Sequence, residues 1–369
     1  MEKFVNFIQL VDMWKLKDSV GLQYDNQGTV ISVTYREMAE AVYGCAEEYA
    51  SSHKDWDLII CDHSPETIYR LMGAVIAGVD VILADESLAP PVIEGMKKVI
   101  TETLHPQIPV DGRKPEGRLL FFTSGTTNRS KAVVLTSASL LGSAWSGQCM
   151  LPCGEGDILL SILPLAHVFG FVCTFLWGVC YGATIALGRG VRYMMDDCDH
   201  FHPTILPVVP TMVDMLLRLD ALNPELKVVL VGAAPAKEAS VEALHAKNIR
   251  VYLGYGLTET SSGIAITQDQ ETPYAMAPCP GADIRIEEDG EISVATPNMM
   301  TEYLGFGNPC LDGRFYTGDL GRLDERGYLY ITGRKKDMLV LSDGTKVYCP
   351  EYEDELAQLL ATLLVTPDL

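Results

Sequence analysis

The sequence predicts an α/β protein with mainly parallel sheets, followed by a smaller antiparallel region. Apolar runs of strand length alternate with amphipathic segments of helix length through the first two thirds of the 369 residues. Such alternation is typical of parallel sheets covered by helices. From about Gly281 the pattern changes to short strands on either side of tight turns. A chain of this length exceeds one hydrophobic core, so we expect two or more domains or subdomains.

The elements follow in order along the chain. The apolar runs predict buried strands over 58–61, 79–84, 119–122, 158–162, 184–187, 204–208, 228–231 and 251–253. The segments between them predict helices over 35–51, 65–77, 137–150, 169–181, 211–219 and 237–246. In the last region, two strand pairs are expected around the turns Asp289-Gly290 and Arg326-Gly327.

Charge and cysteine content exclude several classes of protein. The net charge is −21, from 49 acidic and 28 basic residues, which disfavours non-specific binding to nucleic acid or anionic membrane. The ten cysteines contain no C-x-x-C pair, and we interpret them as buried free thiols in a reducing compartment. The N-terminus lacks the pattern of a signal peptide. A cytoplasmic protein is therefore expected.

One stretch has the length of a membrane span. Residues 158–187 contain no Asp, Glu, Lys or Arg, so length alone allows a transmembrane helix. Pro164, His167 and glycines 170, 178 and 182 divide the stretch into strand, loop, helix and strand. A buried core segment is the favoured interpretation, and no membrane span is expected.

The stretch from Leu119 to Thr136 predicts a phosphate-binding loop. An apolar strand runs into small hydroxylated residues and ends in one lysine, Lys131. Gly125 lets the backbone approach a ligand, and hydroxyl donors flank it at Thr123, Ser124, Thr126 and Thr127. The common phosphate loop requires glycine directly before the lysine, where this chain has Ser130. The alternative for this loop alone is a Ser/Thr-rich turn.

Four later segments bear on the interpretation of this loop. The turn at 232–235, Gly-Ala-Ala-Pro, presents a flat backbone surface that suits a purine ring. The segment YLGYGLTET at 252–260 offers an aromatic ring, a hydroxyl and a carboxylate. Asp319 precedes a basic cluster at 334–336, and VYCPEYEDEL follows at 347–356.

In this order, the segments resemble the AMP-forming adenylating family of acyl-CoA synthetases, luciferases and peptide-synthetase adenylation domains. The match covers nearly the whole chain, and GRKKDMLVLSDGTKV at 333–347 looks closest to the long-chain acyl-CoA synthetase branch. The resemblance implies an acetyl-CoA synthetase-like fold. It divides the chain into two α/β subdomains over 1–280, a small β subdomain over 281–333, and a hinge with a remnant of the C-terminal domain over 334–369.

The resemblance also implies a reaction. A carboxylate attacks the α-phosphate of ATP, giving an acyl-adenylate and pyrophosphate, and a thiol such as CoA then accepts the acyl group. ATP, Mg²⁺ and CoA are the expected cofactors, and a small carboxylic acid is the expected substrate. A fatty or other apolar acid is favoured, because LPLAHVFGF at 163–171 lacks the aspartate that amino-acid activators of this family carry there.

Residue roles follow from the same resemblance. The implied catalytic residues are Lys131, Thr258 and Glu259, with Glu259 also holding Mg²⁺. The implied nucleotide-binding residues are Thr123, Ser124, Gly125, Thr126, Thr127, Gly232, Ala233, Ala234, Pro235, Tyr255, Gly256, Asp319, Arg334 and Lys336. The implied acid pocket contains His167, Val209 and Gly254. Taken singly, His167 could be a core residue and Asp319 a turn residue. A metal site at Cys198, His200 and His202 is disfavoured, since no matching ligand pair follows.

The chain departs from the family pattern in two places. The loop has Asn128, Arg129 and Ser130 where the family has glycine and proline, although the lysine spacing is kept. The chain also ends 32 residues after Asp337 and has no lysine after Lys346. The family's C-terminal domain supplies a lysine for adenylation. Three explanations of this ending stay open: the chain is a fragment, a partner chain supplies the domain, or the activity is altered. The alternative functions are transfer of the acyl group to an acyl carrier protein and nucleotide binding by a pseudoenzyme.

Overall fold

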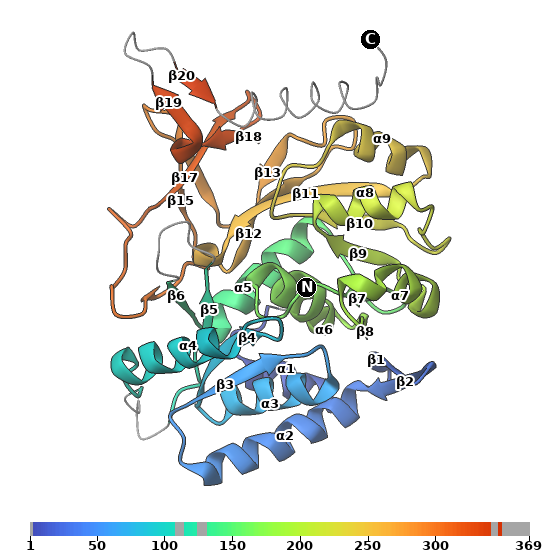
Figure 1. Cartoon of the computed structure of the whole chain (residues 1–369), viewed down its shortest axis with the longest axis vertical. Coiled ribbons are helices and arrows are strands. Elements are labelled where there is room, and N and C mark those ends of the chain that lie inside the picture. The colour runs from blue at the N-terminus through green and yellow to red at the C-terminus, as the bar shows by residue number, and fades with distance from the viewer. Residues whose placement is uncertain (1–2, 108–113, 124–130, 341–345, 349–369) are drawn as a thin grey trace, which may run out of the picture. The chain divides into compact units, whose positions relative to one another are not determined.

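The computed structural model describes residues 3–107, 114–123, 131–340 and 346–348 (Figure 1). Contacts divide the chain into two compact units. The first unit contains Met1–Ala282 and Thr296–Pro309, and the second contains Asp283–Ala295 and Cys310–Leu369. Each unit is described by itself below.

The larger sheet of the first unit has the strand order β13-β12-β11-β10-β9-β7-β8-β1-β2. The central strands from β11 to β1 pair in parallel, whereas β2, β12 and β13 add antiparallel edges. The strands are β1 (Val20–Asn26), β2 (Thr29–Thr34), β7 (Ile158–Ser161), β8 (Thr184–Leu187), β9 (Ile205–Val208), β10 (Val228–Val231), β11 (Arg250–Leu257), β12 (Ser262–Thr267) and β13 (Met276–Pro278).

The second sheet of this unit has the order β16-β6-β5-β4-β3. Its strands β3, β4 and β5 are parallel, and β6 and β16 continue it in antiparallel pairing. The strands are β3 (Trp56–Cys61), β4 (Asp80–Asp85), β5 (Leu119–Phe122), β6 (Ala132–Leu135) and β16 (Glu302–Tyr303). Buried residues of β4, β5 and β6 pack with Met96 and Ile100 of a helix, which closes one face of the sheet.

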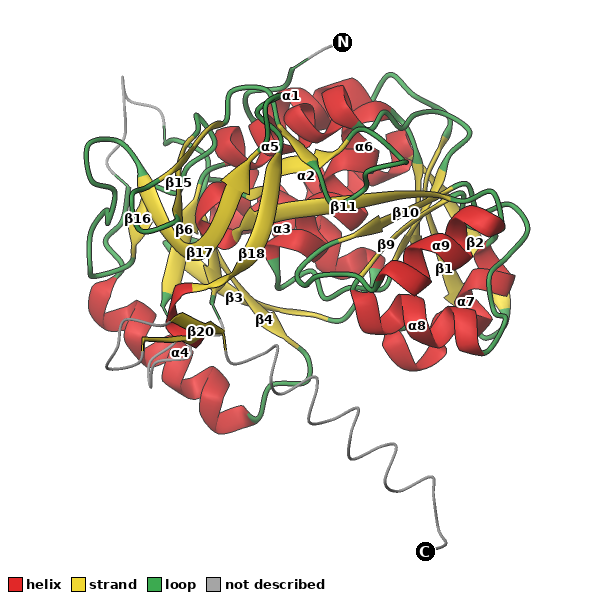
Figure 2. Ribbon diagram, turned by 90° about the horizontal axis from the view of Figure 1, so that it is seen from above, coloured by secondary structure: helices red, strands yellow, loops and turns green. Residues whose placement is uncertain are grey.

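Helices cover these sheets (Figures 1 and 2). They are α1 (Phe7–Trp14), α2 (Tyr35–Ser52), α3 (Pro65–Ile76), α4 (Pro90–Thr103), α5 (Ser137–Met150), α6 (Trp177–Tyr181), α7 (Met194–Phe201), α8 (Pro210–Arg218) and α9 (Glu238–Ala246). Their starts have local causes, because Thr34, Ser64 and Thr136 each cap a helix with a side-chain oxygen. Helix α3 packs on β3 and β4, and α2 packs on α3, while α8 and α9 lie together (Figure 2).

Between the two sheets lie α5 and α6 (Figure 1), and a π-helix, η1 (Gly170–Leu176), packs against both of them. Phe171 of η1 contacts Phe121 of β5 with ring centroids 5.8 Å apart, and η1 also packs on β7 and β9. The apolar stretch 158–187 therefore forms β7, η1, α6 and β8, and its residues are largely buried inside the unit. Among the described residues, no helix is long and apolar enough to cross a membrane.

The second unit contains antiparallel strands in the order β14-β15-β17-β18. Its strands are β14 (Asp283–Ile286), β15 (Glu291–Ala295), β17 (Phe315–Leu323), β18 (Leu329–Arg334), β19 (Met338–Val340) and β20 (Lys346–Tyr348), with the 3₁₀ turn η4 (Lys335–Asp337). The two predicted hairpins are confirmed. Gly290 and Gly327 have φ of 91° and 76°, conformations that favour glycine at those turns.

One expected boundary differs from the structure. The sequence analysis assigned 281–333 to one small subdomain, but 296–309 belong to the first unit. The cause is pairing, because β16 joins β6 and the N–H of Met300 donates to the carbonyl of Glu259 at 2.8 Å. These short contacts have no periodic signal in the sequence.

The expectation of buried thiols holds for five of the nine cysteines whose side chains are described, and none of the nine forms a disulfide. Cys149, at the end of α5, is exposed, and Cys45, Cys173 and Cys310 are partly exposed. The expectation that all are buried is therefore wrong at these four positions. Cys349 lies outside the described residues.

Candidate active site

The carboxyl ends of three neighbouring parallel strands meet at one edge of the larger sheet. Val208 of β9 pairs with Val231 of β10, which pairs with Leu253 of β11. Directly after these three paired residues come Val209, Gly232 and Gly254. In open α/β sheets, this edge is the usual place for a ligand. The structure thus brings together three residues that were predicted to line the nucleotide and acid sites.

The turn at 232–235 has the features that a flat ligand surface needs. Ala233 adopts a left-handed conformation with φ of 68°, which is strained for a residue other than glycine. Ala233, Ala234 and Pro235 are exposed, whereas Gly232 is buried. A Cβ on Gly232 would lie 2.8 Å from the ring of Phe169, so only glycine permits this close approach. The turn therefore exposes backbone and small side chains at the edge of the sheet.

His167 lies in the loop between β7 and η1. The residue is exposed, although Leu165, Ala166 and Val168 around it are buried. An exposed histidine in an otherwise buried stretch is not a satisfied core residue. Because β7 pairs with β9, this loop follows a strand of the same parallel set as Val209. The placement is compatible with the role in the acid pocket that the resemblance implied.

The residues on either side of the predicted phosphate loop lie on paired strands. Strands β5 and β6 pair from Leu119 to Phe122, and the N–H of Thr123 donates to the carbonyl of Lys131 at 3.0 Å. This pairing holds the loop as the connection of an antiparallel hairpin, with Lys131 exposed at its end. Ser124, Gly125, Thr126 and Thr127 lie outside the described residues.

The turn after β11 carries Thr258 and Glu259 on a 3₁₀ turn, η3 (Thr258–Thr260). Thr260 is fully buried, and its hydroxyl accepts from the N–H of Leu257 and donates to the carbonyl of Ser262 at 2.8 Å. Ser261 and Ser262 have φ of 56° and 105°, which are strained values for serine. A tight, strained turn therefore positions Glu259, which is half-buried.

Tyr303 contacts two of the predicted site residues, and the sequence analysis assigned it no role. Its hydroxyl donates to Oε1 of Glu259 at 2.6 Å, and Nζ of Lys131 lies 4.5 Å from the centroid of its ring. Lys131 and Glu259 thus meet on one side chain, although they are far apart in sequence. Tyr303 belongs to TEYLG at 301–305, a segment that the resemblance included without assigning it a role.

The predicted ribose-binding pair forms within the second unit. Asp319 pairs with Arg334 across β17 and β18, with Nε and Oδ1 2.9 Å apart. Asp319 is buried and its neighbour Gly318 has φ of 75°, so the aspartate follows a turn that favours glycine. Lys335 binds Asp289 and Glu291, and these contacts raise its pKa. Lys336 is exposed.

The sequence analysis disfavoured a metal site at Cys198, His200 and His202. No group of three or more metal-ligating side chains is found in the described part of the chain. His200 Nε2 instead lies 3.0 Å from Asp25, and His202 Nδ1 lies 3.3 Å from Glu225. A cation site with nucleotide phosphates as further ligands needs only one or two carboxylates, which Glu259 can supply.

The parallel strands, with an exposed turn of small residues at their carboxyl edge, define an α/β protein of the class that binds ligands at this edge. Residues 97–304 match the family described as AMP-binding enzyme. The chain belongs to this family. The fold of the whole chain is the α/β architecture of adenylate-forming enzymes, as the solved structures below also indicate.

The chain is also similar to curated relatives and to solved structures. A 2-succinylbenzoate–CoA ligase of Bacillus velezensis is 35% identical over 261 residues, which cover 64% of this chain and 52% of that protein. O-succinylbenzoate coenzyme A synthetase of Bacillus subtilis, solved with ATP and magnesium ion, has a TM-score of 0.78 and 25% identity, covering 96% of this chain and 84% of that one. An anthranilate CoA ligase solved with anthranoyl-AMP has a TM-score of 0.81 at 16% identity, covering 94% and 80%.

The chain spans about half the length of the first two curated relatives, 52% and 54%. The acids named for these relatives and for the two structures are aromatic carboxylic acids. The sequence analysis favoured a fatty or other apolar acid, and none of these names specifies a fatty acid.

Proposed function

We propose that this chain activates a small carboxylic acid with ATP, releasing pyrophosphate, and passes the acyl group to CoA. The observation that carries the proposal is the meeting of Lys131 and Glu259 on Tyr303, in a member of the AMP-binding enzyme family. One cation suited to phosphate and one carboxylate suited to a metal ion are two of the groups that this reaction needs. Both reactants are anions, so charge neutralisation and alignment dominate catalysis.

The residues present fit Mg²⁺ bound together with ATP. Glu259 offers carboxylate oxygens and Thr258 a hydroxyl, and hard cations prefer oxygen ligands. When bound, Mg²⁺ supplies positive charge that offsets the charge of the phosphates. Lys131 would hold the leaving phosphates at the end of the loop, and Thr258 would bond the α-phosphate. The exposed turn at 233–235, with Tyr255, would flank adenine. Within the second unit, Asp319 with Arg334 would bind ribose hydroxyls, and Lys336 stays a predicted nucleotide-binding residue.

The proposed acid has an apolar or aromatic body. Val209 and Gly254 directly follow the parallel-paired residues of β9 and β11, and the ring of Phe169 approaches Gly232. The stretch 163–171, which holds the exposed His167, contains no carboxylate. Of the fatty or other apolar acids expected from the sequence, we favour aryl acids, in line with the acids named for the relatives. CoA is the proposed acceptor, because those names specify it and none of them specifies a carrier protein.

Pyrophosphate release with hydroxylamine trapping tests the proposal. The chain is supplied with ATP, Mg²⁺ and a panel of acids that includes straight-chain fatty acids, 2-succinylbenzoate and anthranilate. At least one acid is expected to stimulate release and to yield its hydroxamate. If no acid does so while ATP still binds, the chain is a nucleotide-binding pseudoenzyme and the proposal fails.

Variants then test the roles of the charged residues. Lys131→Ala is expected to lower the rate by roughly 10² to 10³, by analogy with the loss of one transition-state donor. The matched control is Lys247→Ala, which removes another partly exposed lysine, paired with Asp220 on the surface. The control rate should stay unchanged, and an equal loss in both variants would contradict the role of Lys131.

A further inference from the structure

Tyr303 contacts both charged residues on which the proposed function depends. Only 8% of the residue is exposed, and its hydroxyl lies 2.6 Å from Oε1 of Glu259. This distance is typical of a hydroxyl that donates to an ionised carboxylate. On the same ring, Nζ of Lys131 lies 4.5 Å from the centroid, within the range of a cation–π interaction. One side chain thereby links a predicted metal ligand to a predicted phosphate ligand.

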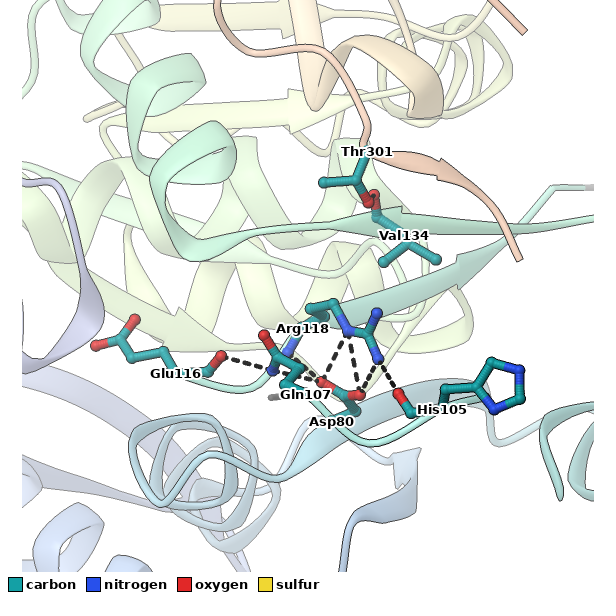
Figure 3. Close-up of polar contacts among 7 residues, drawn as sticks. All are labelled: Asp80, His105, Gln107, Glu116, Arg118, Val134 and Thr301. Carbon is teal, nitrogen blue, oxygen red and sulfur yellow. Dashed lines mark hydrogen bonds and ion pairs between the residues drawn. The ribbon is translucent and has the colours of Figure 1, made fainter. Parts of the chain in front are cut away.

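The backbone around Tyr303 is fixed to the elements that carry both partners. The N–H of Met300 donates to the carbonyl of Glu259 at 2.8 Å, which ties the segment to η3. Thr301 donates to the carbonyl of Val134 from its N–H at 3.0 Å and from its hydroxyl at 3.1 Å (Figure 3). Leu304 N–H donates to the carbonyl of Ala132, the residue after Lys131, at 2.9 Å. The segment 300–304 therefore joins η3 to the end of the phosphate loop.

The two contacts of Tyr303 have different physical effects. The hydroxyl holds Oε1 of Glu259, and the structure records no hydrogen bond to Oε2 from the described residues. A carboxylate fixed through one oxygen loses rotational freedom before it meets a cation, so less entropy is lost on binding. The ring holds the ammonium group of Lys131 near the loop without neutralising its charge. Lys131 therefore stays available to phosphate.

We infer that Tyr303 is a positioning residue that orients Glu259 toward the cation of bound Mg·ATP and holds Lys131 at the phosphate loop. The inference rests on the proposed function and adds a residue to its site. Because the hydroxyl and the ring act on different partners, two substitutions separate their effects. Tyr303→Phe removes the hydroxyl and keeps the ring, whereas Tyr303→Leu removes both.

Nucleotide binding tests the inference without reference to turnover. ATP affinity is measured by calorimetry with and without Mg²⁺, and metal binding is followed by the paramagnetic resonance of Mn²⁺. Loss of a partner of a metal ligand typically lowers metal affinity 10- to 100-fold. Tyr303→Phe should therefore raise the half-saturating Mg²⁺ concentration by roughly 10-fold, with metal-free ATP affinity changed less than about twofold. Tyr303→Leu should in addition lower the affinity for ATP in the absence of metal by about two- to fivefold.

Tyr49→Phe is the matched control. Tyr49 is also 8% exposed, and its hydroxyl donates to Asp57 at 2.6 Å, away from the proposed site in the same unit. Both Tyr→Phe variants should lose some thermal stability, because each removes one buried donor to a carboxylate. The loss should be smaller for Tyr49→Phe, since Asp57 keeps Lys54 and Arg70 as donors. Only Tyr303→Phe should change the Mg²⁺ dependence.

The possible outcomes distinguish failure of the inference about Tyr303 from failure of the proposed function. If Tyr303→Phe keeps the Mg²⁺ dependence of the unaltered chain, or if Tyr49→Phe shifts it equally, the inference is overturned and the proposed function stands. If the unaltered chain binds no ATP at any Mg²⁺ concentration, the proposed function is overturned and the inference falls with it.

Discussion

A Cβ atom on Gly256 would lie 2.0 Å from the carbonyl oxygen of Ser262. Real Cβ atoms do not approach backbone this closely, so the two strands β11 and β12 can meet here only at a glycine. The register of the pair also shifts between Tyr255 and Gly256, which marks a bulge. This bulge begins the turn that carries Thr258 and Glu259, and the turn geometry depends on the missing side chain.

Gly256→Ala is therefore expected to destabilise the first unit and to weaken ATP binding. Forcing a methyl group into packed backbone costs about 1–3 kcal/mol of unfolding free energy. Gly263→Ala is the control, since a Cβ there meets nothing within 4 Å and Gly263 is part of the same strand pair. Urea unfolding and ATP calorimetry on both variants check the prediction. If both variants have the same unfolding free energy and the same ATP affinity, the close approach of Gly256 to Ser262 does not matter for stability or binding.

Glu259→Gln tests the carboxylate itself. Glutamine keeps the size of the side chain and an oxygen that can accept from Tyr303, but it removes the negative charge. We expect stability to change little and the half-saturating Mg²⁺ concentration for ATP binding to rise at least 10-fold, because Mg²⁺ is held mainly by charged oxygens. Mn²⁺ resonance and calorimetry measure this shift. An unchanged Mg²⁺ dependence would remove Glu259 from the metal site.

The parallel strands and their ends were predictable from sequence because the signal is local. Runs such as 228–231 and 119–122 are apolar throughout, and the structure has β10 and β5 over the same residues. The helices at 137–150 and 35–51 were predicted to within a residue, since each begins after a capping threonine. The helix expected over 169–181 proved to be a π-helix followed by α6, because hydrogen-bond spacing is not encoded in hydrophobic pattern.

Other elements have too weak a hydrophobic pattern in the sequence to be predicted. The edge pair β1 and β2 is only partly buried and mixes polar with apolar residues, so its pattern is faint. Tyr303 was missed for a different reason, because its role depends on two contacts to residues distant in sequence. The candidate site was thus predictable where a motif occupies consecutive residues. It was not predictable where tertiary structure assembles it, as at Met300 to Leu304.

The ion pair of Asp80 and Arg118 is expected to be a major source of stability in the first unit. Asp80 is 2% exposed and accepts from the backbone N–H, Nε and Nη2 of Arg118, with Gln107 as a further donor (Figure 3). Arg118→Ala would leave a buried carboxylate without its cation and should cost about 3–5 kcal/mol of unfolding free energy. Urea unfolding measures the loss.

The control for this pair is Arg326→Ala. Arg326 also binds an aspartate through Nε and Nη2, but the pair with Asp324 lies at the surface, where an ion pair contributes at most about 1 kcal/mol. A double variant, Asp80→Asn with Arg118→Ala, should recover part of the stability that Arg118→Ala loses, because the buried charge is gone. No recovery would mean that Arg118 stabilises by packing alone.

His63 should make the first unit less stable as the pH falls. The residue follows β3, and its Nδ1 lies 3.1 Å from the carbonyl of Ser161, the last residue of β7. Burial lowers the pKa of His63 below its usual 6.5, outweighing the hydrogen bond to Ser161 and the charges of Asp62, Asp85 and Glu86, which raise it. The unfolded chain therefore takes up a proton near pH 6.5 that the folded chain resists.

This contribution to stability is complete above about pH 6.5 and declines as the pH falls toward the lower pKa of the folded state. His63→Asn removes the titrating group, and asparagine tolerates the φ of 56° at this position. We expect the unfolding free energy of the variant to depend less steeply on pH between about 7 and 5 than that of the unaltered chain. Urea unfolding at a series of pH values measures both slopes, and parallel curves would show that His63 titrates alike in the folded and unfolded states.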